Sequence, residues 1–154
     1  MTPVRVLGIG SPWGDDRIGW LAAEALRPMV TDAAVEIRVL DRPGATLVAH
    51  LGDAEAVLLL DAVQGGGTPG RLHRVAGPAI AACARAPLAT HGFGVAEALA
   101  LAAALGHLPR RLCLLGVEIA ASQPAAAPSA PVLAALPALL DAARAQLHAW
   151  RQAG

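Results

Sequence analysis

Short apolar runs alternate along this chain with segments in which apolar residues recur every three to four positions. The runs predict buried strands, because a strand covered on both faces of a parallel sheet is apolar almost throughout. The periodic segments predict amphipathic helices. The predicted strands are Val4–Ile9, Val35–Leu40, Ala56–Leu60, Arg71–Val75 and Arg111–Val117. The predicted helices run from Ile18 to about Pro28, over Ala45–Leu51 and Val95–Leu105, and from Val132 to about Trp150.

The alternation of strands and helices predicts an α/β protein. Parallel strands need crossover connections, and these are usually helices. We therefore expect a single-domain, doubly wound, mostly parallel sheet with helices on both faces, spanning residues 1–154. This length suits one hydrophobic core. The glycine-rich run Gln64–Gly70 is expected to be a mobile loop at the rim of the site, and Ser122–Pro131 a proline-rich connection.

Composition narrows the range of partners. Hydrophobic residues make up 55% of the chain, yet charged residues, proline or glycine interrupt every apolar stretch. None reaches the roughly 18 residues of a spanning helix, so we expect no membrane segment. The opening MTPVRVLGIG shows no secretion signal, which favours the cytoplasm. Basic and acidic residues number 12 each, so neither nucleic acid nor an anionic membrane is an expected partner.

The residues that follow the predicted strands are the candidates for chemistry, because open α/β sheets bind ligands beyond the carboxyl ends of their strands. Asp15 and Asp16 begin the first helix, where helix capping explains one carboxylate and the second invites another role. Asp61 ends the third strand, where turn formation is an equal alternative. His91 lies in the loop ATHGFGV before a helix, although an isolated histidine more often has a structural or surface role.

Taken together, Asp16, Asp61 and His91 supply two oxygen ligands and one nitrogen ligand at neighbouring loops of one crevice. This set suits a divalent first-row metal and leaves coordination positions open, which is typical of a reactive site. The other four histidines have no acidic company at strand ends and are assigned no function; they are His50, His73, His107 and His148. Neither Cys83 nor Cys113 belongs to a CxxC pair or lies beside a histidine, so reduced structural thiols are expected.

A dinucleotide-binding fold is the less favoured alternative. Gly8 and Gly10 lie at the end of the first strand, and Asp41 ends the second, where a ribose-binding acid would lie. The third glycine of GxGxxG is replaced by Trp13. Carboxylates at the helix N-terminus would also repel a pyrophosphate.

Four motifs together resemble the hydrogenase maturation protease family, which processes the large subunits of nickel-iron hydrogenases. They are VLGIGSPWGDDRIG, LLLDAV, THGFGVAEAL and RLCLLGVE. The resemblance implies that Asp16 and Asp61 are the acidic nickel ligands, that His91 is the histidine ligand, and that Asp41 is a further acidic position of the family. The turn RPGAT after Asp41 departs from the family's glycine- and threonine-containing turn.

The resemblance implies an endopeptidase that removes a C-terminal extension from the hydrogenase large-subunit precursor after nickel insertion. Nickel held by the precursor is then the recognition feature, and another divalent ion is a candidate surrogate. Asp16, Asp41, Asp61 and His91 form the implied catalytic set. A metal-polarised carbonyl, a metal-activated water, and Asp16 or Asp41 as general base all remain open. The alternative is a non-catalytic module of the same fold that captures a metal or a peptide.

Overall fold

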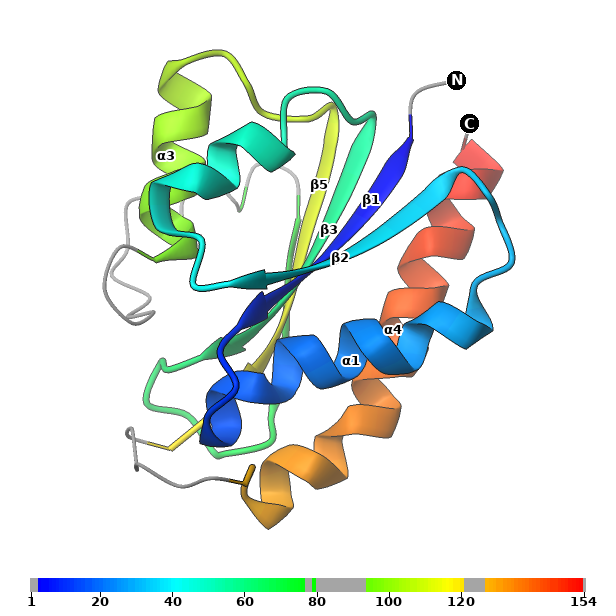
Figure 1. The fold of residues 1–154 in the computed structure, drawn as a ribbon. Coiled ribbons are helices and arrows are strands. Elements are labelled where there is room, and N and C mark those ends of the chain that lie inside the picture. The colour runs from blue at the N-terminus through cyan, green and yellow to red at the C-terminus, as the bar shows by residue number, and fades with distance from the viewer. Residues whose placement is uncertain (1–2, 77–78, 80–93, 121–126, 154) are drawn as a thin grey trace.

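Five strands form one sheet in the order β2-β1-β3-β5-β4 in the computed structural model, which describes residues 3–76, 79, 94–120 and 127–153 (Figure 1). The strands are β1 (Val4–Gly10), β2 (Val35–Asp41), β3 (Ala56–Val63), β4 (Leu72–Ala76) and β5 (Arg111–Glu118). All pair in parallel except β4, which lies antiparallel to β5 at one edge. The predicted doubly wound, mostly parallel sheet is confirmed.

Helices cover both faces of the sheet, as the sequence predicted. On one face lie α1 (Ile18–Leu26), which follows the short 3-10 helix η1 (Gly14–Arg17), and α4 (Ala130–Ala153). On the other face lie the 3-10 helix η3 (Gly44–His50) and α3 (Val95–Ala104) (Figure 1). A last 3-10 turn, η2 (Arg27–Met29), ends the first helical segment at the expected proline.

The two helical layers explain why the central strands are apolar on both faces. Alternate residues of a strand point to opposite faces. Along β3, Leu58 and Leu60 belong to the apolar cluster under α1 and α4, whereas Val57 and Leu59 belong to the cluster under η3 and α3. All four side chains are completely buried. Each such side chain contributes roughly 1.5–3 kcal/mol to folding.

Glycines at the end of β1 fix the position of the first helical segment. A Cβ atom on Gly8 would collide with the backbone of Gly19 in α1, and one on Gly10 would collide with the carbonyl oxygen of Asp16. The backbone of η1 therefore lies directly against the end of β1, where the Ser11 amide donates to the Asp16 carbonyl at 3.3 Å. The glycines thus serve this close packing, which holds Asp16 at the carboxyl end of the sheet.

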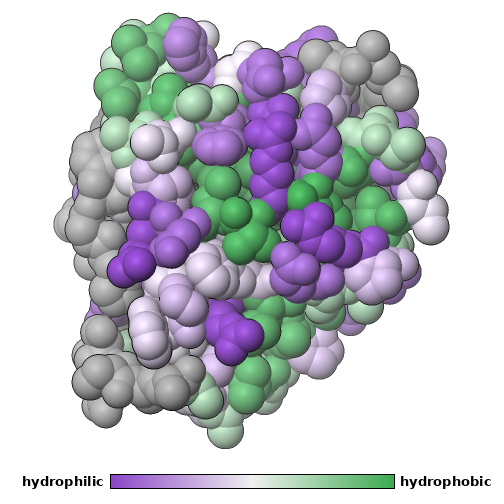
Figure 2. Space-filling view, in the orientation of Figure 1, coloured by the Kyte–Doolittle hydropathy of each residue, from purple (hydrophilic) through white to green (hydrophobic). Residues whose placement is uncertain are grey.

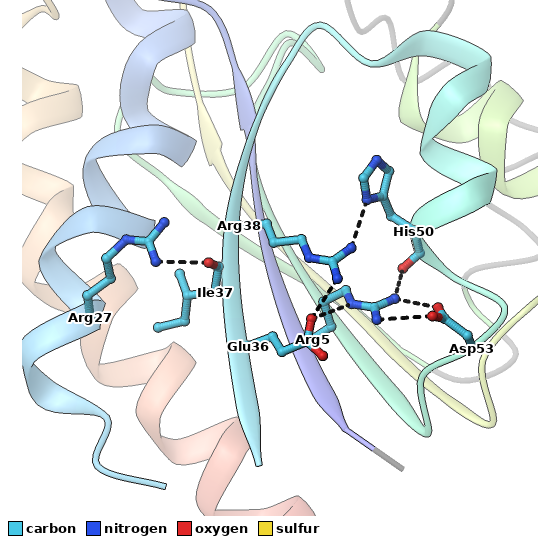
Figure 3. Close-up of polar contacts among 7 residues, drawn as sticks. All are labelled: Arg5, Arg27, Glu36, Ile37, Arg38, His50 and Asp53. Carbon is cyan, nitrogen blue, oxygen red and sulfur yellow. Dashed lines mark hydrogen bonds and ion pairs between the residues drawn. The ribbon is translucent and has the colours of Figure 1, made fainter. Parts of the chain in front are cut away.

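The amino-terminal end of the sheet carries a buried arginine with a full set of partners (Figure 3). Arg5 of β1 is 2% exposed, and its guanidinium donates to both oxygens of Asp53, at 2.6 and 3.3 Å. It also donates to the His50 carbonyl at 2.8 Å and to Glu36 at 3.4 Å. The carboxylates hold the pKa of Arg5 above its usual value, with the Asp53 hydrogen bond as the largest cause.

The glycine-rich loop after β3 is held by a buried carboxylate. Glu118, 1% exposed, accepts from the Gly65 amide at 2.7 Å, and its main-chain oxygen accepts from the Gly70 amide at 2.8 Å. Hydrogen bonds thus hold both ends of the loop, and its expected mobility stays a prediction. Its anchor lies in the last residue of β5, far away in the sequence.

The surface mixes polar and apolar groups. Figure 2 shows hydrophilic side chains gathered in several separate groups around a central apolar area. Among the described residues, no helix is both long enough and apolar enough to cross a bilayer.

Candidate functional site

A crevice opens at the carboxyl end of the sheet, where β1 and β3 part. Their pairing ends at Gly8 and Leu60, whereas β1 continues beside β2 as far as Asp41, and β3 beside β5 as far as Val63. The strand order reverses at this point, which is where open α/β sheets bind ligands. A cavity of about 250 Å³ lies there, which we call the crevice. Its lining comes from the end of β1, η1, the turn after β2, β3 and the start of α3; the residues used below are Asp16, Arg42, Asp61, Gly94 and Val95.

Asp61 is the buried acid of the crevice. It is 5% exposed, and its Oδ1 accepts one hydrogen bond, from the Ala62 amide at 2.8 Å. Burial raises its pKa well above the ordinary value, the charge of Asp16 raises it further, and the Ala62 hydrogen bond opposes both. Asp61 does not end its strand as expected, because β3 continues to Val63 in register with β5. The carboxyl group is therefore held by rigid backbone rather than by a turn.

The two adjacent aspartates of η1 have separate surroundings. Asp15 accepts hydrogen bonds from the amide and hydroxyl of Ser129, at 2.6 and 3.1 Å, just before α4 begins. It therefore caps a distant helix rather than its own, whose first turn has no side-chain cap. Asp16 is half-buried and lines the crevice. Capping thus accounts for one of the two carboxylates, and the other faces the site.

Asp41 lies beside the crevice rather than in its lining. Its side chain is half-exposed, and Oδ1 accepts from Arg42 Nε at 2.7 Å. Arg42 itself lines the crevice, and the Arg42 amide donates to the Gly10 carbonyl at 2.8 Å. Sequence reasoning noted the RPGAT turn but did not select this arginine. The signal that could have found it is its place directly after a strand end.

His91, the third expected ligand, lies outside the described residues. Gly94 and Val95, which follow it closely in the sequence, line the crevice at the start of α3. Within the described part of the chain, no three His, Cys, Asp or Glu side chains are grouped as a metal site. The structure therefore brings Asp16 and Asp61 to one cavity and leaves the place of His91 as a prediction.

A second acid at a strand end was also missed. Glu118 of β5 contacts His73 of β4, with 3.0 Å between Oε1 and Nε2, so His73 does have acidic company. The rule that selected Asp61, an acid closing an apolar strand, selects Glu118 equally well. Cys113 is buried and free, and burial raises the pKa of its thiol, which disfavours the thiolate of a nucleophile. Cys83 lies outside the described residues.

A crevice lined by two acids at the switch point of a mostly parallel sheet is where an open α/β protein binds its ligand. The family model described as hydrogenase maturation protease matches residues 23–146. The chain belongs to the hydrogenase maturation protease family. The matched range includes Asp41, Asp61 and His91, and Asp16 lies just before it.

Known proteins agree with this assignment. The hydrogenase expression/formation protein HupD of Thiocapsa roseopersicina is 36% identical over 118 residues, which are 75% of this chain and 53% of that protein. The chain thus spans about half the length of this relative. A hydrogenase 2 maturation peptidase from a Thaumarchaeota archaeon is 30% identical with a TM-score of 0.70, over 95% of this chain and 98% of that one. The hydrogenase maturating endopeptidase HybD from E. coli has the same fold, with a TM-score of 0.80 at 24% identity over 99% of this chain and 94% of that one.

Proposed function

We propose that this protein is an endopeptidase that removes the C-terminal extension of a nickel-iron hydrogenase large-subunit precursor after nickel insertion. Family membership supports the reaction class. The observation that carries the proposal is that Asp16 and Asp61, remote in sequence, line one crevice at the carboxyl end of the sheet. We propose that these carboxylates, together with His91, bind the nickel that the precursor carries.

The charge of the crevice supports recognition of a cation. Asp61 is buried beside a like charge, which disfavours its ionised form. A divalent cation bound by both carboxylates would replace that repulsion by attraction and would displace the proton of Asp61. A precursor without nickel offers no such gain. The crevice can therefore distinguish the loaded precursor from the empty one by bonding to the metal of the substrate.

The same carboxylates are placed to move protons during hydrolysis. A general base has to accept the proton of the attacking water, and a carboxylate in hydrogen-bond reach can do so. Asp16 is half-buried in the crevice, whereas Asp41 is engaged by Arg42. We therefore favour Asp16 over Asp41 as the base. The same carboxyl group can then pass the proton on to the leaving nitrogen.

The test is a cleavage assay with purified protein and purified precursor, either loaded with nickel or free of it, followed by intact mass. We expect truncation of the loaded precursor only. Asp16→Asn, Asp61→Asn and His91→Ala should each abolish truncation. Asp141→Asn and His107→Ala are matched controls, because both residues are exposed and lie outside the crevice lining. Both controls should cleave like the wild type.

Each outcome has a distinct meaning. A stable complex with the loaded precursor but no truncated product would favour the non-catalytic binding module. Equal cleavage of loaded and nickel-free precursor would refute nickel recognition but leave the protease. Normal cleavage by all three site variants would refute the assignment of the site. The cytoplasmic location stays a prediction, which cell fractionation would check.

A further inference from the structure

Arg42 lines the crevice together with Asp16 and Asp61, and its side chain is 63% exposed. Among the described residues that line the crevice, Arg42 is the only cationic one. Its Nε is occupied by Asp41 at 2.7 Å, and within the described part of the chain its two terminal amino groups have no hydrogen-bond acceptor. A guanidinium offers five donors in a planar fork. The pairs of N–H groups on both terminal nitrogens are thus available to a ligand in the crevice.

The backbone at Arg42 is unusual for this residue. Its φ is +41°, in the left-handed region that disfavours residues with a Cβ atom, and it also precedes proline. Glycine would adopt this conformation more easily. Such strain often marks a functional position, because the surrounding structure has to hold it in place. Here the bond from the Arg42 amide to the Gly10 carbonyl ties the residue to the end of β1.

The reaction proposed above creates a negative charge in the crevice. The oxygen of water bonds to the scissile carbonyl carbon, and the carbonyl electron pair moves onto its own oxygen. The proton lost by water passes through a crevice carboxylate to the leaving nitrogen as the carbon–nitrogen bond breaks. The carboxylic acid that forms then gives its proton to the amine. The same oxygen is therefore carbonyl, oxyanion and carboxylate in turn, and two aspartates alone would repel it.

We propose that Arg42 is a further catalytic residue, which donates hydrogen bonds to the scissile carbonyl oxygen and stabilises its negative charge in the intermediate and the product. Asp41 is a positioning residue that holds the guanidinium through Nε. This inference rests on the proposed function, since it needs a peptide bond to be cleaved in the crevice. It assigns a chemical role to the RPGAT turn, and it replaces the expectation that Asp41 acts on the substrate directly.

The test compares Arg42→Gly, Arg42→Lys and the control Arg110→Gln in the cleavage assay with nickel-loaded precursor. Glycine suits the left-handed backbone, so Arg42→Gly removes the side chain without disturbing the turn. We expect its kcat to fall by about 100-fold or more, with a smaller change in KM. Arg42→Lys keeps the charge but loses the planar fork of donors, so its kcat should fall by about 10-fold. Arg110 is exposed, lies at the opposite end of β5 and should leave kcat unchanged.

A product-inhibition experiment gives a second readout. Peptides that match the new C-terminus of the product are offered with a free carboxylate or as the C-terminal amide. Wild type and Arg110→Gln should bind the carboxylate form about 10-fold more tightly or better, because Arg42 forms a charge-assisted pair with it. Arg42→Gly should bind both forms alike.

Double variants test the role of Asp41. If Asp41 acts only through Arg42, Asp41→Ala should weaken the preference for the carboxylate peptide, and adding it to Arg42→Gly should lower kcat no further. Additive losses would show that Asp41 acts on its own and would overturn its positioning role. Wild-type kcat in Arg42→Gly, or an intact carboxylate preference, would overturn the role of Arg42. If wild type and Arg110→Gln both leave the loaded precursor uncut, the proposed function itself fails.

Discussion

The two ends of the sheet bury charge in opposite ways. At the amino-terminal end, Arg5 is almost inaccessible and is matched by two carboxylates and a carbonyl oxygen (Figure 3). At the carboxyl-terminal end, Asp61 is similarly buried, yet it accepts one backbone hydrogen bond and faces the like charge of Asp16. Arg5 thus keeps its charge among partners within the fold, whereas burial beside Asp16 disfavours the charged form of Asp61, as is common at functional sites. The comparison separates structural ion pairs from a functional site in one molecule.

The largest effect is expected at Asp61. Asp61→Asn should abolish cleavage, because the crevice loses one of its two proposed acidic nickel ligands. The pKa of Asp61 is raised in the folded protein. The wild type is therefore most stable against unfolding below pH 3.8, the ordinary pKa, and loses stability as the pH rises from there toward the folded pKa. The Asn side chain does not ionise, so Asp61→Asn removes this fall in stability with pH. Thermal unfolding across pH should therefore show the variant gaining on wild type as pH rises, and a constant difference would contradict the unmatched charge.

Substitution of Arg5 should have the opposite effect, lowering stability and leaving cleavage unchanged. Arg5→Met should lower the free energy of unfolding by about 2 kcal/mol, less than for a fully buried pair because Asp53 is exposed to water. Cleavage per folded molecule should not change. Arg27→Met is the control, since Arg27 is half-exposed and its pair with Glu24 should contribute under about 1 kcal/mol. Urea denaturation measures both variants, and equal losses would show that burial of Arg5 adds nothing.

The two adjacent aspartates of η1 are expected to differ in the same way, one supporting the fold and the other the reaction. Asp15→Ala removes both hydrogen bonds to Ser129 at the start of α4 and should cost about 1 kcal/mol. Its kcat should stay at the wild-type value. Asp16→Ala should show the reverse, with cleavage lost and stability kept. Denaturation and cleavage measured on the same preparations would check this, and a loss of activity in both variants would refute the division of roles.

A smaller effect is expected from the strained turn. Arg42→Gly relieves the positive φ, while glycine loses more entropy on folding and the exposed pair with Asp41 is lost. The free energy of unfolding should therefore change by less than about 1 kcal/mol. Thermal unfolding of the variant used in the cleavage assay measures this change. A large destabilisation would mean that the side chain supports the fold rather than the reaction.

The smallest effect concerns Asp53 and has the opposite sign in pH from that of Asp61. The Arg5 hydrogen bond lowers the pKa of Asp53, so its stabilisation is present above 3.8 and is lost as pH falls through the lowered value. Asp53→Asn should thus be slightly less stable than wild type at neutral pH and equal to it in acid. Unfolding midpoints measured from pH 2 to 7 would show this difference. A difference that persists in acid would point to a lost contact other than charge.

Much of the fold could be predicted because it depends on local patterns. The apolar runs of β1 and β3 predicted strands buried on both faces, and alternation with helices indicated parallel pairing. Strand ends were less accurate: β3 continues past Asp61 to Val63, because its pairing with β5 extends there. Nothing local in the sequence encodes the length of a neighbouring strand.

The site could be predicted in part. The strand-end rule selected Asp16 and Asp61, and the structure brings them to one crevice. It did not select Arg42 as a lining residue, nor did it reveal that Glu118 anchors the glycine-rich loop. Both depend on contacts between segments that are distant in the sequence.

The sequence by itself determined the layers of this protein and the acids at the carboxyl edge of its sheet, because side-chain periodicity and the order of elements are local properties. Only the tertiary structure decided which of those acids is buried, which one caps a helix and which cationic residue lines the same crevice. The register of β3 against its neighbours sets the burial of Asp61, and the close packing of η1 on Gly10 brings Asp16 to the same cavity. Burial and distance are properties of space, and they set the charge state on which the chemistry depends.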